Sequence, residues 1–251
     1  MHVPLQYDKM RVIRLIQRKY ILLCRKQCEQ EGEDAMLVRY TTTGNSELEC
    51  EPGSGGRVLR NLLGIKRKRE MDQVEYEALL RAQRAYLERI TPGTQFTARI
   101  LCQMHKDWLG KIYEWAGRYR NVDMEKAGFR WPPATRVAEH MERFESTLLR
   151  VHTPCRPAPI QEVALRIAIV HAELLFIHPF REGNGRLARW LADLMAMQAN
   201  YPPPDYGFTG KGSKARQSAY LQAVTRGYLQ DYEPLTAFFL EALQRSLRDV
   251  E

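Results

Sequence analysis

The spacing of apolar residues along the chain predicts a protein built mainly of helices. In the segment 160–177 the apolar positions recur at intervals of three and four, which places them on one face of a helix. The segment 185–199 repeats this pattern and is followed by prolines at 202–204, which cannot continue a helix. We therefore expect two consecutive helices joined by a short turn.

The same periodicity predicts further helices over residues 71–90, 97–115, 134–150, 213–229 and 234–248. Residues 117–133 lose the helical period around Gly117, Gly128 and the pair Pro132-Pro133, which favours a small hairpin. The expected fold class is mainly α, a compact helical bundle with a small β-hairpin.

The N-terminal part of the chain has a different character. Residues 8–30 form a basic helical stretch, and residues 41–56 are rich in Thr, Gly, Ser, Glu and Pro, as in a linker. We expect residues 1–56 to be an N-terminal basic helix with a linker, and residues 57–251 to form one domain.

Composition narrows the class of protein. The chain has 251 residues, of which 44% are apolar and 27% charged, so it is long enough to bury a core and is not disordered by composition. It contains no apolar run of roughly 18 residues that could cross a bilayer. The five cysteines are scattered and lack the spacing of a zinc site, which favours free thiols in a cytoplasmic protein. A net charge of +8 favours anionic partners, namely nucleotides, nucleic acid or an acidic protein surface.

One segment between the two strongest helices carries candidate chemistry. Gly183, Asn184 and Gly185 can form a tight turn that presents backbone N–H groups, and a helix begins there. The N-terminus of a helix binds anions. Arg186 and Arg189 lie on one face of its first turns, where each cation opposes the helix dipole by about 0.3 to 1 kcal/mol. A bound polyanion would explain both arginines.

Two further residues of this segment could do chemistry on such an anion. Glu182 is a carboxylate beside the expected phosphate site, and a magnesium ion that bridges phosphates uses one or two protein carboxylates. His178 ends the preceding helix, and a neutral imidazole can accept a proton from a hydroxyl group. We expect Glu182 to be a Mg²⁺ ligand and His178 to be a general base.

Residues 178–189 read His-Pro-Phe-x-Glu-Gly-Asn-Gly-Arg-x-x-Arg, which resembles the signature of Fic-domain (Fido) proteins at nine fixed positions. The segment 58–65 and the stretch from His105 to Arg120, which includes residues 112–117, also resemble this family, so the likeness runs from about residue 57 to about residue 245. The resemblance implies a Fic-type helical bundle whose hairpin is a flap that aligns a target protein. It marks Gly128, Phe129 and Arg130 as target-binding flap residues.

The resemblance also implies a protein adenylyltransferase, which transfers AMP from ATP to a Tyr, Thr or Ser hydroxyl of a target protein and releases pyrophosphate. His178 would then be the catalytic base and Glu182 the ligand of Mg²⁺. Five residues would bind the phosphates of ATP: Gly183, Asn184, Gly185, Arg186 and Arg189.

Several alternatives stay open at this point. One branch of the superfamily carries lysine in place of Gly185 and acts as a kinase, and other members transfer UMP or phosphocholine or remove AMP. A non-enzymatic basic module that binds nucleic acid is a further alternative, although backbone binding needs neither His178 nor Glu182. We expect neither nucleic acid nor a membrane as the partner.

Many family members carry an inhibitory helix of the form Ser/Thr-x-x-x-Glu-Gly/Asn. Thr43 with Glu47 and Thr135 with Glu139 match this pattern only in part, and we interpret both as chance. The hypothesis is a bacterial, toxin-like regulator whose inhibitor is a separate small antitoxin-like protein.

Overall fold

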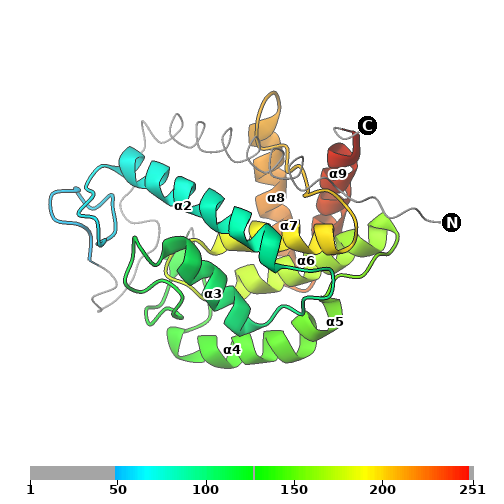
Figure 1. The fold of residues 1–251 in the computed structure, drawn as a ribbon, viewed down its shortest axis with the longest axis horizontal. Coiled ribbons are helices and arrows are strands. Elements are labelled where there is room, and N and C mark those ends of the chain that lie inside the picture. Colours follow the sequence, from blue (N-terminus) through cyan, green and yellow to red (C-terminus); the bar gives the residue numbers. More distant parts are fainter. Residues whose placement is uncertain (1–48, 127, 249–251) are drawn as a thin grey trace.

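The computed structural model describes residues 49–126 and 128–248, which form the helical body in Figure 1. The basic stretch 8–30 and the pair Thr43 and Glu47 lie outside the described residues. The division of the chain at residue 56 therefore stays a prediction.

The described residues are mainly helical, which confirms the predicted fold class. The helices are α2 (Lys68–Arg89), α3 (Ala98–Leu109), α4 (Val137–Phe144), α5 (Arg150–His152), α6 (Ile160–Ile177), α7 (Asn184–Gln198), α8 (Ser213–Gly227) and α9 (Glu233–Arg248). A 3₁₀ turn, η2 (Ala134–Arg136), leads into α4, and a π-helical turn, η3 (Glu145–Leu149), joins α4 to α5. The strands are β1 (Glu125–Lys126) and β2 (Phe129–Arg130). No described helix is long and apolar enough to cross a membrane.

Helix α6 is the centre of the bundle. It packs against α4, α7, α8 and α9, and its buried residues lie on most of its circumference. A helix that is apolar nearly all round is one covered on all sides. In Figure 1, α4 and α5 form the lower edge of the molecule, and α8 and α9 stand near its C-terminal end. This arrangement places the end of α6 and the start of α7 inside the fold.

The predicted helix over residues 97–115 is too long, because α3 ends at Leu109. The Thr97 side chain caps its N-terminus by accepting a hydrogen bond from the backbone N–H of Ile100. The chain then turns back at Gly117, whose φ is +81° and where a Cβ would lie 2.6 Å from the Cβ of Lys106. The apolar residues after α3 are therefore buried in an irregular segment that packs on α3.

The predicted hairpin is present, with two residues in each strand. Glu125 pairs with Arg130 and Lys126 with Phe129 in antiparallel register. The guanidinium of Arg130 also forms an ion pair with Glu125 at 3.0 Å.

The three cysteines that the structure describes, Cys50, Cys102 and Cys155, are free thiols. The other two, Cys24 and Cys28, lie outside the described residues.

Candidate active site

The turn between α6 and α7 is held by the side chain of Asn184. Its Oδ1 accepts a hydrogen bond from the N–H of Phe180 at 2.9 Å, and its Nδ2 donates to the carbonyl of Phe180 at 2.7 Å. Both the oxygen and the nitrogen of the amide group are therefore engaged inside the turn, and Asn184 is 3% exposed. For an anion bound at α7, Asn184 has its backbone N–H to offer rather than its side chain.

Gly183 packs tightly against α3. Its φ is +85°, and a Cβ at this position would lie 2.8 Å from Cζ3 of Trp108. Only glycine adopts this backbone conformation at so close an approach without strain. At Gly185, by contrast, a Cβ would make an ordinary contact of 3.6 Å with Nη1 of Arg189. The sequence therefore needs glycine at 183 for steric reasons that do not apply at 185.

His105 of α3 supports the same turn, although sequence reasoning did not identify it as a site residue. Its Nδ1 accepts a hydrogen bond from the N–H of Gly117 at 2.9 Å, so the ring proton is on Nε2, which donates to the carbonyl of Glu182 at 3.0 Å. The ring stacks on Phe180 at 4.0 Å between centroids. Burial lowers the pKa of His105 to about 4, so the ring is neutral.

Arg186 is already bound by acidic partners. Its Nη1 donates to Oε2 of Glu75 on α2 at 2.6 Å, and its Nη2 lies 3.4 Å from Oε1 of Glu182. Glu75 is 4% exposed and also accepts a hydrogen bond from the hydroxyl of Tyr113 at 2.6 Å. The guanidinium carbon lies 4.7 Å from the ring centroid of Trp108. These contacts hold Arg186 in one place beside Glu182.

Arg189 has a different environment. Within the described part of the chain it forms no ion pair that the structure records, and its Nε is buried with no hydrogen-bond partner. The hydroxyl of Tyr220 lies near its guanidinium and is itself hydrogen-bonded to Nε2 of His171 at 2.7 Å. A buried donor without an acceptor costs about 1 to 3 kcal/mol, which a bound anion would remove. Of the two motif arginines, Arg189 is the better suited to bind a phosphate.

His178 ends α6 in the left-handed conformation, with φ 51° and ψ 60°. Its Nδ1 lies 3.1 Å from the carbonyl oxygen of Leu175, which can only accept, so Nδ1 carries the ring proton and Nε2 does not. The ring packs against Trp131 at 4.2 Å between centroids. Burial lowers the pKa of His178 to about 4, which keeps the imidazole neutral at physiological pH. A neutral Nε2 is a proton acceptor.

Glu182 has limited capacity to hold a metal ion by itself. Its Oε1 accepts a hydrogen bond from the N–H of Gly183 at 2.9 Å. Within the described residues, no group of three His, Cys, Asp or Glu side chains could hold a metal ion. Magnesium commonly uses one or two protein carboxylates together with phosphate oxygens and water. Glu182 fits that arrangement, in which the nucleotide supplies further ligands.

The hairpin predicted as a target-binding flap is linked to His178 through Trp131, which follows β2 and whose ring centroid lies 4.2 Å from that of His178. Phe129 packs on Trp131 and on Tyr228 of the chain after α8, while Gly128 has φ +78° and open space around it. The indole N–H of Trp131 donates to the carbonyl of Leu175 at 3.0 Å. The end of the hairpin is thus attached to the last turn of α6, from which His178 follows.

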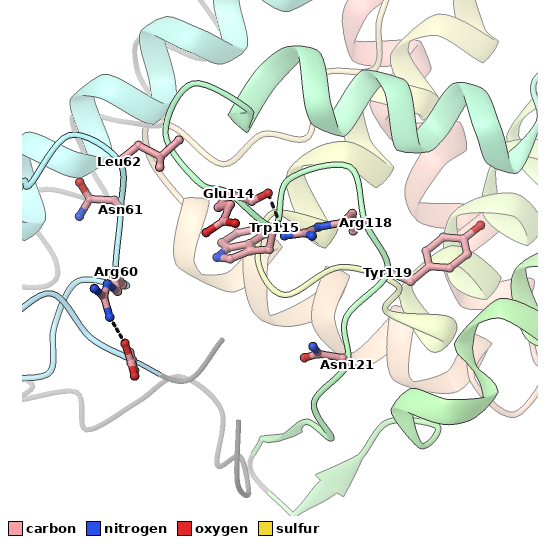
Figure 2. A pocket seen from close by; sticks show the side chains of 9 residues that line it. Arg60, Asn61, Leu62, Glu114, Trp115, Arg118, Tyr119 and Asn121 are labelled. Atoms are coloured by element: carbon pink, nitrogen blue, oxygen red, sulfur yellow. Dashed lines mark hydrogen bonds and ion pairs between the residues drawn. The ribbon is translucent and has the colours of Figure 1, made fainter. Parts of the chain in front are cut away.

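A pocket of about 540 Å³ lies away from the motif residues, between the 49–62 segment and the chain that follows α3 (Figure 2). Its lining includes ion-paired Arg60 and Glu49, and Arg118, which donates to the carbonyl of Glu114 at 3.1 Å. Trp115 forms part of its wall. None of the residues 178–189 lines this pocket, so it is separate from the candidate active site.

Buried neutral histidines predict that stability falls in mild acid. Burial lowers the pKa of His171 to about 3 and that of His105 to about 4, whereas unfolded histidine titrates near 6.5. Below about pH 6.5 the unfolded chain therefore binds more protons than the folded protein. The stability that the buried neutral histidines contribute is fully present above this pH, and it is lost as the pH falls toward their folded pKa values. Between pH 7 and pH 5 we expect a loss of about 2 kcal/mol for each histidine.

Urea titrations at pH 7 and pH 5 measure this loss. The variant His171→Gln should show a smaller difference between the two pH values, whereas His140→Gln, at a partly exposed position on α4, should keep the full difference. Equal stability of the unmodified protein at both pH values would contradict the assignment of neutral buried histidines.

Comparison with known proteins agrees with this geometry. The model of the Fic/DOC family matches residues 95–196, which contain α3, the hairpin, α6 and most of α7. The probable protein adenylyltransferase y4lH of Sinorhizobium fredii is 30% identical over 206 residues, which cover 80% of this chain and 97% of the relative. The protein adenylyltransferase VbhT of Bartonella schoenbuchensis is 31% identical over 158 residues, which cover 63% of this chain but only 32% of VbhT. The matched part of the chain thus covers about a third of the length of VbhT.

A solved structure supports the fold. The BepC protein of Bartonella tribocorum, determined with bound AMPPNP, superimposes with a TM-score of 0.60 at 24% identity. The similarity covers 73% of this chain and 91% of BepC. At this identity it establishes the shared fold.

Proposed function

We propose that this chain, which belongs to the Fic/DOC family, transfers AMP from ATP to a Tyr, Thr or Ser hydroxyl of a target protein and releases pyrophosphate. One observation carries the proposal: the turn that holds a neutral His178 leads directly into a helix N-terminus beside Arg189, whose buried Nε has no partner. A proton acceptor and an anion site are thus joined by a turn of a few residues. The relatives named protein adenylyltransferases and the AMPPNP in BepC support this assignment.

His178 would act as the general base. Its unprotonated Nε2 takes the proton of the target hydroxyl as the hydroxyl oxygen attacks the α-phosphorus of ATP. The new bond joins the target oxygen to the α-phosphorus, and the bond from that phosphorus to the bridging oxygen of the β-phosphate breaks. Pyrophosphate leaves with the electron pair of the broken bond, and AMP stays on the target.

The phosphates would be bound by the start of α7. Gly183 shapes the turn while its own N–H is bonded to Glu182, so the backbone N–H groups of Asn184 and Gly185 and the helix dipole favour the negative charge. Arg189 would place its guanidinium on the outer phosphates, and Arg186, held by Glu75, would add a second positive charge at a fixed position. The protein therefore acts by positioning and by charge stabilisation.

Magnesium would be held by Glu182 together with the phosphates, where it neutralises negative charge on the departing pyrophosphate. The Gly183 N–H at 2.9 Å and Arg186 at 3.4 Å orient the Glu182 carboxylate beside the start of α7, where the phosphates would lie.

Target recognition would use the flap. A strand of the target pairs with the hairpin, where Gly128, Phe129 and Arg130 are the contact residues. Any inhibition would come from a separate small antitoxin-like protein. Glu139 of α4, one of the partial matches to an inhibitory motif, pairs with Arg136 of η2 at 2.8 Å and not with a motif arginine in the described part of the chain. We place this toxin-like regulator in the cytoplasm.

The nucleotide products test the reaction class. Incubation of the protein with ATP, magnesium and a bacterial lysate should yield pyrophosphate in proportion to modified protein, and chelation of magnesium should stop both. Formation of ADP would indicate a kinase despite Gly185, and free AMP from an already modified target would indicate de-AMPylation. Either result in place of pyrophosphate would overturn the proposal.

A further inference from the structure

Arg120 is a buried cation in the segment between α3 and the hairpin. It is 2% exposed, and its backbone N–H donates to the carbonyl of Pro179 at 2.8 Å. Burial lowers its pKa to about 10, so the guanidinium still carries its charge at physiological pH. Within the described residues, the hydrogen-bond partners that the structure records for its side chain are backbone carbonyls, and the nearby carboxylate of Asp123 favours its charge.

One side of the guanidinium binds the end of α6. Its Nε donates to the carbonyl of His178 at 2.8 Å, and its Nη2 lies 3.4 Å from the carbonyl of Ile177. The last carbonyls of a helix have no partners within the helix, and a cation there is favoured by the dipole. His178 is also held in the left-handed conformation, which disfavours a residue with a Cβ. Arg120 therefore fixes the backbone of the candidate base.

The other side of the guanidinium binds both ends of the flap. Its Nη1 donates to the carbonyl of Val122 at 2.8 Å, before β1, and its Nη2 donates to the carbonyl of Pro132 at 2.6 Å, after β2. A single planar group thus contacts the segment that enters the hairpin, the segment that leaves it and the residue that would take the proton. A lysine ammonium cannot reproduce this fork of donors.

We propose that Arg120 is a positioning residue that fixes the flap relative to His178, so that a target strand paired with the flap presents its hydroxyl to Nε2. This inference rests on the proposed AMP transfer. The hydrogen bonds of the Arg120 guanidinium do not reach Glu182, Gly183 or Arg189, so its removal should impair alignment of the target far more than binding of ATP.

The test compares Arg120→Ala and Arg120→Lys with the unmodified protein. Arg118→Ala is the matched control, since Arg118 is exposed two residues away and, among the residues that the structure describes, its guanidinium donates to the carbonyl of Glu114 and contacts neither the flap nor His178 in any recorded hydrogen bond. We expect Arg120→Ala to lower AMP transfer at least tenfold and Arg120→Lys to lower it several-fold, because small misplacements of reacting groups reduce rates strongly. The affinity for a non-hydrolysable ATP analogue should stay within about threefold, and added guanidinium ion should restore part of the transfer in Arg120→Ala.

A second measurement does not depend on activity. Limited digestion with trypsin should cleave the flap after Lys126 and Arg130 faster in both Arg120 variants than in the unmodified protein or in Arg118→Ala, with sites assigned by mass spectrometry. If Arg120→Ala does not fold, Arg120→Lys provides both measurements. Absence of transfer by the unmodified protein would refute the proposed function, whereas the digestion still tests the position of the flap.

The inference would be overturned by transfer within about threefold of the unmodified protein in both variants, or by an unchanged rate of cleavage in the flap. It would equally be overturned if ATP-analogue affinity fell as much as transfer, because Arg120 would then support the whole site rather than the alignment of flap and base.

Discussion

Replacement of His178 by alanine should lower AMP transfer by about a thousandfold, since general-base catalysis contributes factors of roughly 10² to 10⁴. The remaining activity would reflect the phosphate site alone. Affinity for ATP should change by no more than about twofold, because the start of α7 and Arg189 remain in place. Transfer of labelled AMP and calorimetric binding of a non-hydrolysable ATP analogue measure the two effects separately.

The matched control is His140→Ala on α4, which should retain full transfer. Loss of ATP-analogue binding in His178→Ala would show that the residue supports the nucleotide site instead of the proton transfer. Retention of transfer within about tenfold would exclude a role as general base.

Replacement of Gly183 by alanine should weaken ATP binding and transfer by about a hundredfold. The new Cβ would lie 2.8 Å from Cζ3 of Trp108, so the turn must move away from α3 or the indole must shift. Trp108 is 1% exposed and donates to the carbonyl of Glu75 at 2.9 Å, which leaves it little room. The backbone N–H groups of the anion site would be displaced as a result.

The control separates this steric clash from backbone strain. Gly56 has φ +76°, close to the +85° of Gly183, but a Cβ there would meet nothing within 4 Å. Gly56→Ala therefore carries a similar conformational cost of about 1 kcal/mol and should leave ATP binding unchanged. If both variants bind the ATP analogue equally well, the close approach of Gly183 to Trp108 is not needed for the anion site.

Much of the candidate site could be predicted from sequence because its signals are local. The helical periods on either side of residues 178–184 predict a turn there. Gly183 and Gly185 favour a helix N-terminus, where two arginines are unusual because cations oppose the helix dipole. These features need no knowledge of distant contacts. The fold class followed in the same way from the length and spacing of the apolar stripes.

The supporting residues could not be predicted because their partners are distant in the chain. Glu75 binds Arg186 across 111 positions, and His105 binds the carbonyl of Glu182 across 77 positions. Arg120 is an arginine among many in a basic chain, and only the fold places four carbonyls around it. No local pattern distinguishes such residues from surface charges.

At the end of α3 a local pattern was misleading, because the apolar spacing of the helix continues beyond Leu109, where the helix itself ends. Ile112, Tyr113 and Trp115 continue the apolar spacing of the helix, but they are buried after the chain has turned back on α3. Gly110 and Gly117 were the available signals, since one follows the last helical residue and the other has positive φ. A period alone cannot distinguish a helix from an irregular buried segment.

The most direct test of AMP transfer uses ATP labelled at either the α- or the γ-phosphate. The purified protein and its His178→Ala variant are each incubated with magnesium and a bacterial lysate, and labelled proteins are separated on a gel. AMP transfer predicts a labelled protein band from α-labelled ATP only, formed by the unmodified protein and absent with the variant or after chelation. A band from γ-labelled ATP only, or an equal α-labelled band with His178→Ala, would contradict it.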